Sequence, residues 1–176
     1  RTSPSQGEDT GSNPVGTATR QIENERGGRI PGERWIIAFV SYDWQMGWVP
    51  PKIEDVAQEM AKCLVEGDEA SARRLAFRFV EHVDKPITNY RTEMVAARFT
   101  TTGSKRFDAL LAGLAELSCA THHDVAPNWV NDEELFLNEL WFVSEMPLLH
   151  GEALAHSPIS LARRGVFVTQ GSLTYA

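Results

Sequence analysis

Cysteine is scarce in this chain, and long apolar runs are missing. The 176 residues include two cysteines, Cys63 and Cys119, and both have apolar neighbours on segments that we expect to be helical. This setting favours buried free thiols over a disulfide framework of the kind that holds small secreted domains together. No apolar run approaches the ~20 residues that a membrane-spanning helix needs. We therefore expect a cytoplasmic protein with no membrane contact.

Recognisable catalytic motifs are also missing. The chain has no Gly-x-Ser-x-Gly nucleophile turn and no Gly-x-x-x-x-Gly-Lys phosphate loop. The carboxylates of Asp132, Glu133 and Glu134 suit the first turn of a helix, where the helix dipole favours negative charge. We therefore expect neither an enzymatic activity nor a cofactor.

Positive charge is in the minority. The sequence has 17 Lys and Arg residues against 24 Asp and Glu residues, which gives a net charge of −7 and a pI near 5.2. Because phosphate backbones are bound by clustered Lys and Arg, this balance argues against a nucleic-acid-binding face over the whole molecule. An acidic surface fits a soluble protein or one that meets a basic partner.

The composition changes at about residue 33. Glycine and proline are frequent in residues 1–33, and large apolar residues are few there: Val15, Ile22 and Ile30. Such a segment cannot bury enough surface to offset the entropy of ordering it. Residues 7–16 also look like the translation of a tRNA gene. We interpret residues 1–33 as a disordered or artefactual segment and residues 34–176 as one helical domain. Its first stretch, 34–44, is aromatic and β-branched and predicts a short strand or an apolar strap.

Two amphipathic helices are predicted next. Apolar residues between Ile53 and Leu64, and again between Ala72 and Val83, repeat with the i, i+3, i+4, i+7 spacing of one helical face. Gly67 ends the first helix and Asp68 can cap the second. Because the connection is about three residues long, we expect an antiparallel αα-hairpin.

Further helices and an extended tail follow from the same periodicity. Ser104 is a plausible cap for the helix expected at 107–118, and Asn131 with Glu134 resembles a capping box for the helix expected at about 131–142. Val166-Phe167-Val168 predicts a short edge strand or extended tail. The fold class is therefore mainly α, a compact multi-helix domain with an αα-hairpin and a short β-prone C-terminal tail, preceded by a disordered segment. The expected helices are 92–97, 107–118, about 131–142, 147–154 and 157–165.

Four histidines invite a metal-site hypothesis, but their spacing opposes it. His150 and His156 are six residues apart, so they do not share a helical face as an i, i+4 pair would. His122 and His123 follow a predicted helix, where the dipole favours positive charge. We interpret all four as surface or capping residues and expect no metal.

The double arginine near the C-terminus is a candidate for a binding surface. Arginine holds carboxylates bidentately and is frequent at binding hot spots, and Arg163 and Arg164 come just before Gly165. Aromatic side chains would supply an apolar floor beside them. We predict a partner-binding set of Trp141, Phe142, Arg163 and Arg164. In the alternative, structural interpretation, the tryptophans fill the core and the arginines fix the last helix.

A pattern of core and turn residues carries a resemblance to a known family. The pattern comprises Phe107-Asp108-Ala109-Leu110-Leu111-Ala112, Pro127-x-Trp129-Val130, Leu137, Trp141-Phe142-Val143, Leu148, Ala153, Ser157-Pro158 and Arg163-Arg164-Gly165-Val166-Phe167-Val168. Over about residues 42–173 the chain resembles actinobacterial proteins in which this helical region follows a helix-turn-helix regulator domain. Members of that family are typically encoded beside a nucleotidyltransferase-like protein and are thought to be the antitoxin half of a toxin–antitoxin pair.

The resemblance implies a companion toxin as the binding partner. Upstream of Tyr42 the chain has no helix-turn-helix, so the resemblance does not carry DNA binding over to it. Our hypothesis is an antitoxin-like interaction protein that binds and neutralises its companion. The alternatives that stay open are a transcriptional regulator whose C-terminal helices dimerise or sense a ligand, and an enzyme with a site scattered over loops or a histidine-bound metal. A homodimer is compatible with either of the first two functions.

Overall fold

The computed structural model describes residues 51–84 and 90–174, and these residues are mainly helical, as the sequence predicts. The segments predicted at 1–33 and 34–44 lie outside the described residues. None of the described helices combines the length and the apolar character that crossing a bilayer demands.

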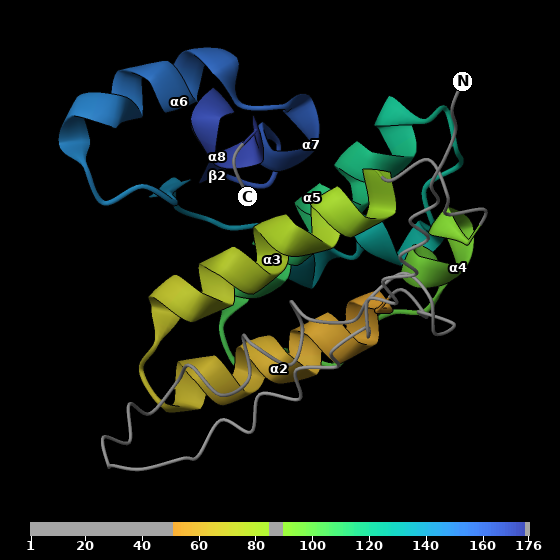
Figure 1. The fold of residues 1–176 in the computed structure, drawn as a ribbon. Coiled ribbons are helices and arrows are strands. Elements are labelled where there is room, and N and C mark those ends of the chain that lie inside the picture. The colour runs from red at the N-terminus through yellow and green to blue at the C-terminus, as the bar shows by residue number, and fades with distance from the viewer. Residues whose placement is uncertain (1–50, 85–89, 175–176) are drawn as a thin grey trace, which may run out of the picture.

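Two amphipathic helices open the described chain as an antiparallel hairpin. They are α2, Ile53–Val65, and α3, Glu69–Asp84, which lie side by side in orange and yellow in Figure 1. Each helix buries the apolar stripe that its spacing predicts. The buried apolar residues are Ile53, Val56, Ala57 and Met60 from α2, and Ala72, Ala76, Phe77, Phe79, Val80 and Val83 from α3. The predicted αα-hairpin is therefore confirmed.

The hairpin turn is built by Gly67 and Asp68. Gly67 has a φ of +78°, and the N–H groups of Gly67 and Asp68 donate to the carbonyls of Leu64 and Cys63 at 3.1 and 2.8 Å. This pair of bonds needs a left-handed residue directly after the helix. Asp68 caps α3, because its Oδ1 accepts the N–H of Ser71 at 2.9 Å. Hydrogen bonding from Ser71 also lowers the pKa of Asp68.

The central helix of the fold is α5, Lys105–Thr121. It is buried continuously from Phe107 to Ala115, because α2, α3 and α4 (Arg91–Ala96) pack on it and the C-terminal segments pack on it as well (Figure 1). A helix that is apolar all round is stable only when it is enclosed in this way. The core of the protein therefore lies around α5.

The start of α5 corrects the predicted capping residue. Ser104 occupies the N-cap position, but its side chain makes no capping hydrogen bond. Asp108, which is buried, instead accepts the N–H and the hydroxyl of Thr102 at 2.8 and 2.7 Å and the hydroxyl of Thr101 at 2.5 Å. A carboxylate one turn inside the helix therefore fixes the preceding loop, an arrangement that a capping pattern does not predict.

The helix predicted at about 131–142 is wrong. Its residues are interrupted at Asp132 and Phe136, which are extended with ψ values of 131° and 133°. The N–H groups of Leu137, Trp141 and Val143 donate to the carbonyls of Arg164, Gly165 and Phe167. Pairing with this returning chain therefore overrides the helical pattern. The structure has two 3₁₀ turns and a strand here: η1, Asn128–Asn131; η2, Glu133–Leu135; and β1, Trp141–Phe142.

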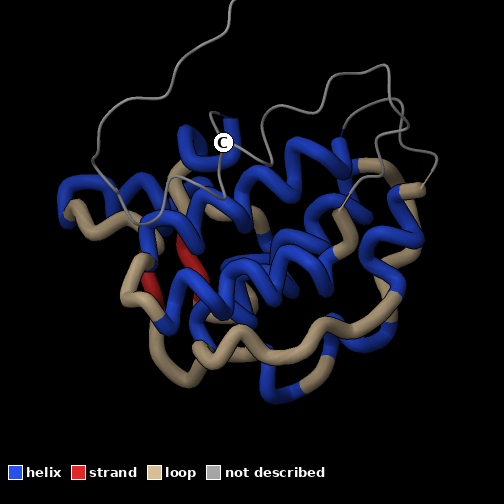
Figure 2. The backbone as a smooth tube through the Cα atoms, turned by 60° about the horizontal axis from the view of Figure 1, so that its bottom comes forward, coloured by secondary structure: helices blue, strands red, loops and turns tan. Residues whose placement is uncertain are grey.

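The strand β1 pairs in parallel with β2, Val166–Phe167. Figure 2 shows the two short strands side by side in red. The helices predicted after Pro147 and after Ser157-Pro158 are confirmed, and so is the extended tail. The apolar periodicity of the sequence does not predict the last helix, Gln170–Thr174. We call residues 141–174 the C-terminal lobe, and its helical elements are η3, Pro147–Leu149; α6, His150–His156; α7, Ile159–Ala162; and α8, Gln170–Thr174.

The lobe meets the central helix most closely where α7 crosses α5. A Cβ on Gly113 of α5 would lie 2.4 Å from Cδ2 and 3.3 Å from Cα of Leu161, which is fully buried. Glycine therefore permits an approach that a larger residue would obstruct. The contact places the end of α7, with Arg163 and Arg164 directly after it, against α5.

Replacing His123 by glycine should stabilise the fold by about 0.5–1 kcal/mol. His123 closes α5 with the same pair of backbone bonds that Gly67 makes after α2, yet its φ is +60°, a region that is strained for a residue with a Cβ. Its side chain is exposed, so little packing is lost. Urea denaturation measures the change. The matched substitution Gly67→Ala should destabilise by about 1 kcal/mol, and an unchanged midpoint in both variants would contradict this account of the two turns.

Candidate partner-binding site

The site is built where the chain leaves α7. Arg163 and Arg164 directly follow that helix, and Gly165 comes next with a φ of +76°. A Cβ on Gly165 would lie 3.1 Å from the carbonyl oxygen of Glu139 and 3.3 Å from Cβ of Leu137. Both the left-handed turn and the close approach therefore require glycine here. The turn sends the chain into β2 and leaves the two arginine side chains over α5.

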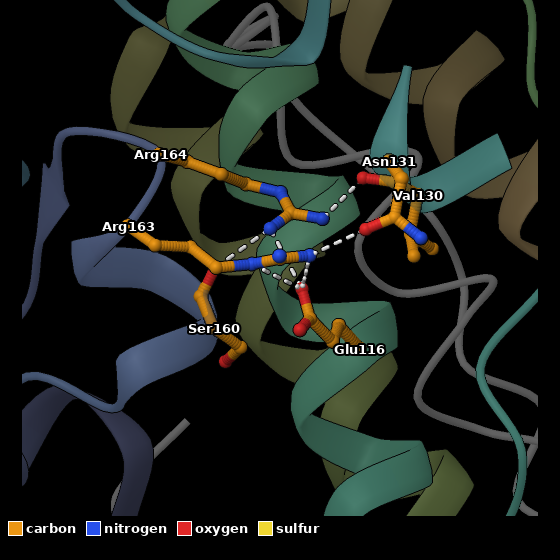
Figure 3. A network of polar contacts seen from close by, with 6 residues as sticks. All are labelled: Glu116, Val130, Asn131, Ser160, Arg163 and Arg164. Carbon is orange, nitrogen blue, oxygen red and sulfur yellow. Dashed lines mark hydrogen bonds and ion pairs between the residues drawn. The ribbon is translucent and has the colours of Figure 1, made fainter. Parts of the chain in front are cut away.

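Arg164 is fully buried, and its guanidinium joins three separate segments. Its Nη1 donates to the carbonyl of Ser160 at 3.0 Å and lies 2.7 Å from Oε2 of Glu116 on α5. Its Nη2 donates to the carbonyl of Val130 in η1. Figure 3 shows these contacts converging on one side chain. Arg164 therefore fastens α7 to α5 and to η1.

Arg163 uses the same carboxylate from a more exposed position. Its Nε and Nη2 donate to Oε2 of Glu116 at 3.1 and 2.7 Å, and its Nη2 also donates to Oδ1 of Asn131 at 2.8 Å (Figure 3). The Arg163 side chain keeps 36% of its surface exposed. Both guanidiniums lie over the ring of Phe136, at 5.4 Å for Arg163 and 4.9 Å for Arg164. We call these five residues the arginine cluster: Glu116, Asn131, Phe136, Arg163 and Arg164.

The electrostatics of the arginine cluster are those of a structural tie. Burial lowers the pKa of Arg164 from its ordinary value, Glu116 raises it, and the neighbouring Arg163 lowers it further. One carboxylate thus serves two guanidiniums, and the Nε of Arg164 has no hydrogen-bond partner. Burying a charged group costs desolvation free energy, which its ion pair and hydrogen bonds must offset. These contacts therefore hold Arg164 in place.

The aromatic residues of the lobe pack inward. Trp141 is half-buried with its ring 5.3 Å from that of Phe107 on α5. Phe142, also half-buried, stacks on His150 with 4.1 Å between ring centroids and an interplanar angle of 11°. The Phe167 ring lies 5.4 Å from that of Phe142. These rings join the two strands to α6 and to α5.

The four residues predicted to bind a partner therefore differ in accessibility. Arg164 exposes no surface, so a partner cannot touch its side chain while the cluster is intact. For Arg164 the structural interpretation is the better one. Arg163, Trp141 and Phe142 each keep part of their surface exposed, and a role in partner contact stays a prediction for them.

The other candidate groups have local roles. His122 lies 3.0 Å from Asp84, and the described residues contain no group of three His, Cys, Asp or Glu side chains that could hold a metal ion. Burial raises the pKa of the Cys119 thiol, and Asp124 and Glu116 raise it further. A raised pKa disfavours the thiolate, which is the nucleophilic form of cysteine.

An open acidic cleft adjoins the arginine cluster. Its volume is about 520 Å³, and its lining residues are Lys105, Asp132, Glu133, Glu134, Phe136 and Asn138. Arg98 pairs with Asp132 at 3.2 Å and also with Glu134. Two of the three carboxylates thus share one arginine, whose single positive charge offsets half of theirs.

Sequence reasoning missed the apolar residues that the C-terminal part of the chain leaves exposed. Leu148 is 88% exposed and Ile159 is 83% exposed. A periodic pattern cannot distinguish a leucine that faces the core from one that faces solvent, unless the neighbouring elements are known. The exposed set in this region is Leu140, Met146, Leu148, Leu154 and Ile159.

The chain was compared with protein-family models, with curated proteins and with solved structures, and no match was found in any of the three comparisons.

Replacing Arg164 by alanine should destabilise the protein by about 3 kcal/mol, because two buried carbonyls lose their donor and a cavity is left. The neighbouring change Arg163→Ala removes a partly exposed ion pair and should cost about 1 kcal/mol or less. Urea denaturation followed by circular dichroism measures both free energies of unfolding. Equal losses in the two variants would contradict the different roles assigned to the two arginines.

Proposed function

We propose that this protein is a non-enzymatic, antitoxin-like interaction protein that binds and neutralises a companion toxin, which is expected to be nucleotidyltransferase-like. The identity of the companion comes from the resemblance carried by residues 107–168. The accessible surface of the C-terminal lobe supports protein binding on separate, physical grounds.

The observation that carries the proposal is the distribution of exposed apolar side chains. The described residues leave eight large apolar side chains exposed, and five of them lie between Leu140 and Ile159. Monomeric proteins seldom concentrate exposed apolar surface, and where they do it commonly marks a protein interface. The same stretch includes the motif residues Trp141-Phe142 and Ser157-Pro158.

The arginine cluster makes this surface suitable for recognition. Arg164 fastens α7 to α5 and to η1, while the stacked rings of Phe142 and His150 hold α6 to β1. A surface whose supporting side chains are fixed loses little conformational entropy on binding. The rigid lobe thus favours a docking role, and the raised thiol pKa values of Cys63 and Cys119 offer no nucleophile in support of catalysis.

The test is co-expression of the tagged full chain with the product of its neighbouring gene. We expect the two proteins to co-purify in a fixed ratio, and we expect this chain to restore growth to cells in which the neighbour alone is toxic. A tagged helical protein of similar size and charge serves as the control.

Failure of both complex formation and growth rescue would overturn the proposal. A mobility-shift assay on the gene's own promoter tests the alternative that the protein is a transcriptional regulator. Specific, salt-sensitive DNA binding would favour that alternative.

A further inference from the structure

The net negative charge of this protein comes from its C-terminal part. Residues 107–176 contain nine of the 24 carboxylates and two of the 17 Lys and Arg residues, so the net charge of −7 falls entirely there. Residues 1–106 balance at 15 of each sign. The two cationic residues of this part are Arg163 and Arg164, and both form ion pairs with Glu116. The C-terminal part thus presents carboxylates with little opposing charge of its own.

One face of η3 and α6 is apolar and uncovered. Gly151, Leu154 and Ala155 have the i, i+3, i+4 spacing of a single helical face, and all three are exposed. Leu148 precedes Gly151 by three residues and continues the row. Ile159 follows at the start of α7 with 83% of its surface exposed. We call Leu148, Gly151, Leu154 and Ala155 the outer face.

The opposite side of α6 is already occupied, so the outer face cannot turn inward. Ala153 is buried against the lobe, and His150 stacks on Phe142. The Oε1 of Glu152 accepts the N–H of Gln170 at 3.2 Å. Any cover for the outer face must therefore come from another molecule or another part of the chain.

Carboxylates accompany the exposed apolar residues along this segment. Glu139 precedes Leu140, Glu145 precedes Met146, and Glu152 lies between Leu148 and Leu154. Arg73 of α3 reaches Glu145, with its Nη1 2.9 Å from Oε1, and also donates to the carbonyl of Val143 at 3.3 Å. Residues 107–176 keep a net negative charge even when this arginine is counted with them.

The net negative charge of the C-terminal part discriminates between three molecules that could cover the outer face: a second copy of the chain, a nucleic acid and a basic protein. Two copies of the chain that met through their outer faces would bring together two C-terminal parts that each carry net negative charge, which opposes association. A nucleic acid would be repelled for the same reason. A protein that surrounds an apolar pocket with lysine and arginine side chains is complementary in both charge and polarity.

We propose that the outer face docks the companion protein, and that the companion meets it with a basic, apolar-centred surface. This inference rests on the proposed function in that it takes the companion to be a protein; it adds which face binds and what chemistry the partner presents. The apolar residues supply the buried centre of the interface, and the net negative charge of residues 107–176 supplies the attraction at long range.

A synthetic amphipathic helix tests the chemistry of the face without the companion. The probe has leucines along one side and lysines flanking them, and its control has glutamates in place of the lysines. We expect the lysine peptide to bind and the glutamate peptide not to bind. The amide chemical-shift changes should be concentrated at residues 145–160 of the full chain. Equal binding of the two peptides, or shift changes elsewhere, would overturn the inference.

Two matched pairs of variants locate the interface. Leu148→Lys should weaken binding of the lysine peptide at least tenfold, on the order of a hot-spot loss. The control Val65→Lys makes the same charge change at the end of α2 and should leave the affinity unchanged, since Val65 is 89% exposed against 88% for Leu148. The double change Glu139→Gln and Glu145→Gln, at two exposed positions, should slow association and reduce its salt dependence. The same double change at the exposed residues Glu66 and Glu81 should do neither.

The outcomes separate this inference from the proposed function. If the neighbouring gene product binds but Leu148→Lys and Val65→Lys reduce its affinity equally, the outer face is not the docking surface and the antitoxin proposal stands. If the lysine peptide binds at the outer face and the neighbouring gene product does not, the antitoxin proposal fails and the docking chemistry stands. A concentration-dependent dimer that Leu148→Lys abolishes would overturn the choice of a basic partner in favour of a second copy.

Discussion

The buried guanidinium of Arg164 is the constraint on which the C-terminal half of this protein depends. It is reached by residues that are far apart in sequence, Glu116 on α5, Val130 in η1 and Ser160 in α7. A guanidinium with no exposed surface is costly unless it is paired and hydrogen-bonded, so displacing any of these segments would leave a buried charge short of partners. The cost of misplacing the lobe is therefore high, whatever the net stability of the ion pair. This constraint, together with the close approach of Leu161 to Gly113, sets the position of the lobe on the central helix.

A fixed lobe has consequences for its surface. The inward side of the lobe is filled by the rings of Trp141, Phe142 and Phe167 and by Ala153, so there is no room for the exposed leucines to rotate into the core. Apolar surface that cannot be hidden by local rearrangement remains in contact with water until another molecule or another part of the chain covers it. The same packing that stabilises the lobe thus leaves its outer face available.

The accuracy of sequence reasoning along this chain follows the range of the interactions involved. The α2–α3 hairpin is predictable because its helical periods, Gly67 and Asp68 all act within a few residues. The segment from Asn131 to Phe142 is mispredicted as a helix because its backbone partners are in residues 164–167, which no local pattern can indicate. For the site, residue type identifies the arginine pair, but the two arginines reach the same carboxylate and only the tertiary structure distinguishes the buried one from the exposed one. The outer face is missed for a related reason, since Leu148 and Leu154 have the same local pattern as core residues.

The distribution of charge bears on why a protein with a helical core would carry an uncovered apolar face at all. An exposed apolar surface by itself favours self-association and other non-specific contacts. The excess of carboxylates in residues 107–176 and the absence of Lys and Arg from residues 107–162 raise the energy of contact between two copies and with nucleic acid, and they lower the energy of contact with a basic surface. Proteins that handle RNA or nucleotides need such basic surfaces to bind phosphate. An acidic, apolar-centred face is therefore suited to covering the functional surface of such a protein, which is the physical connection between the lobe of this chain and the neutralising role that we propose.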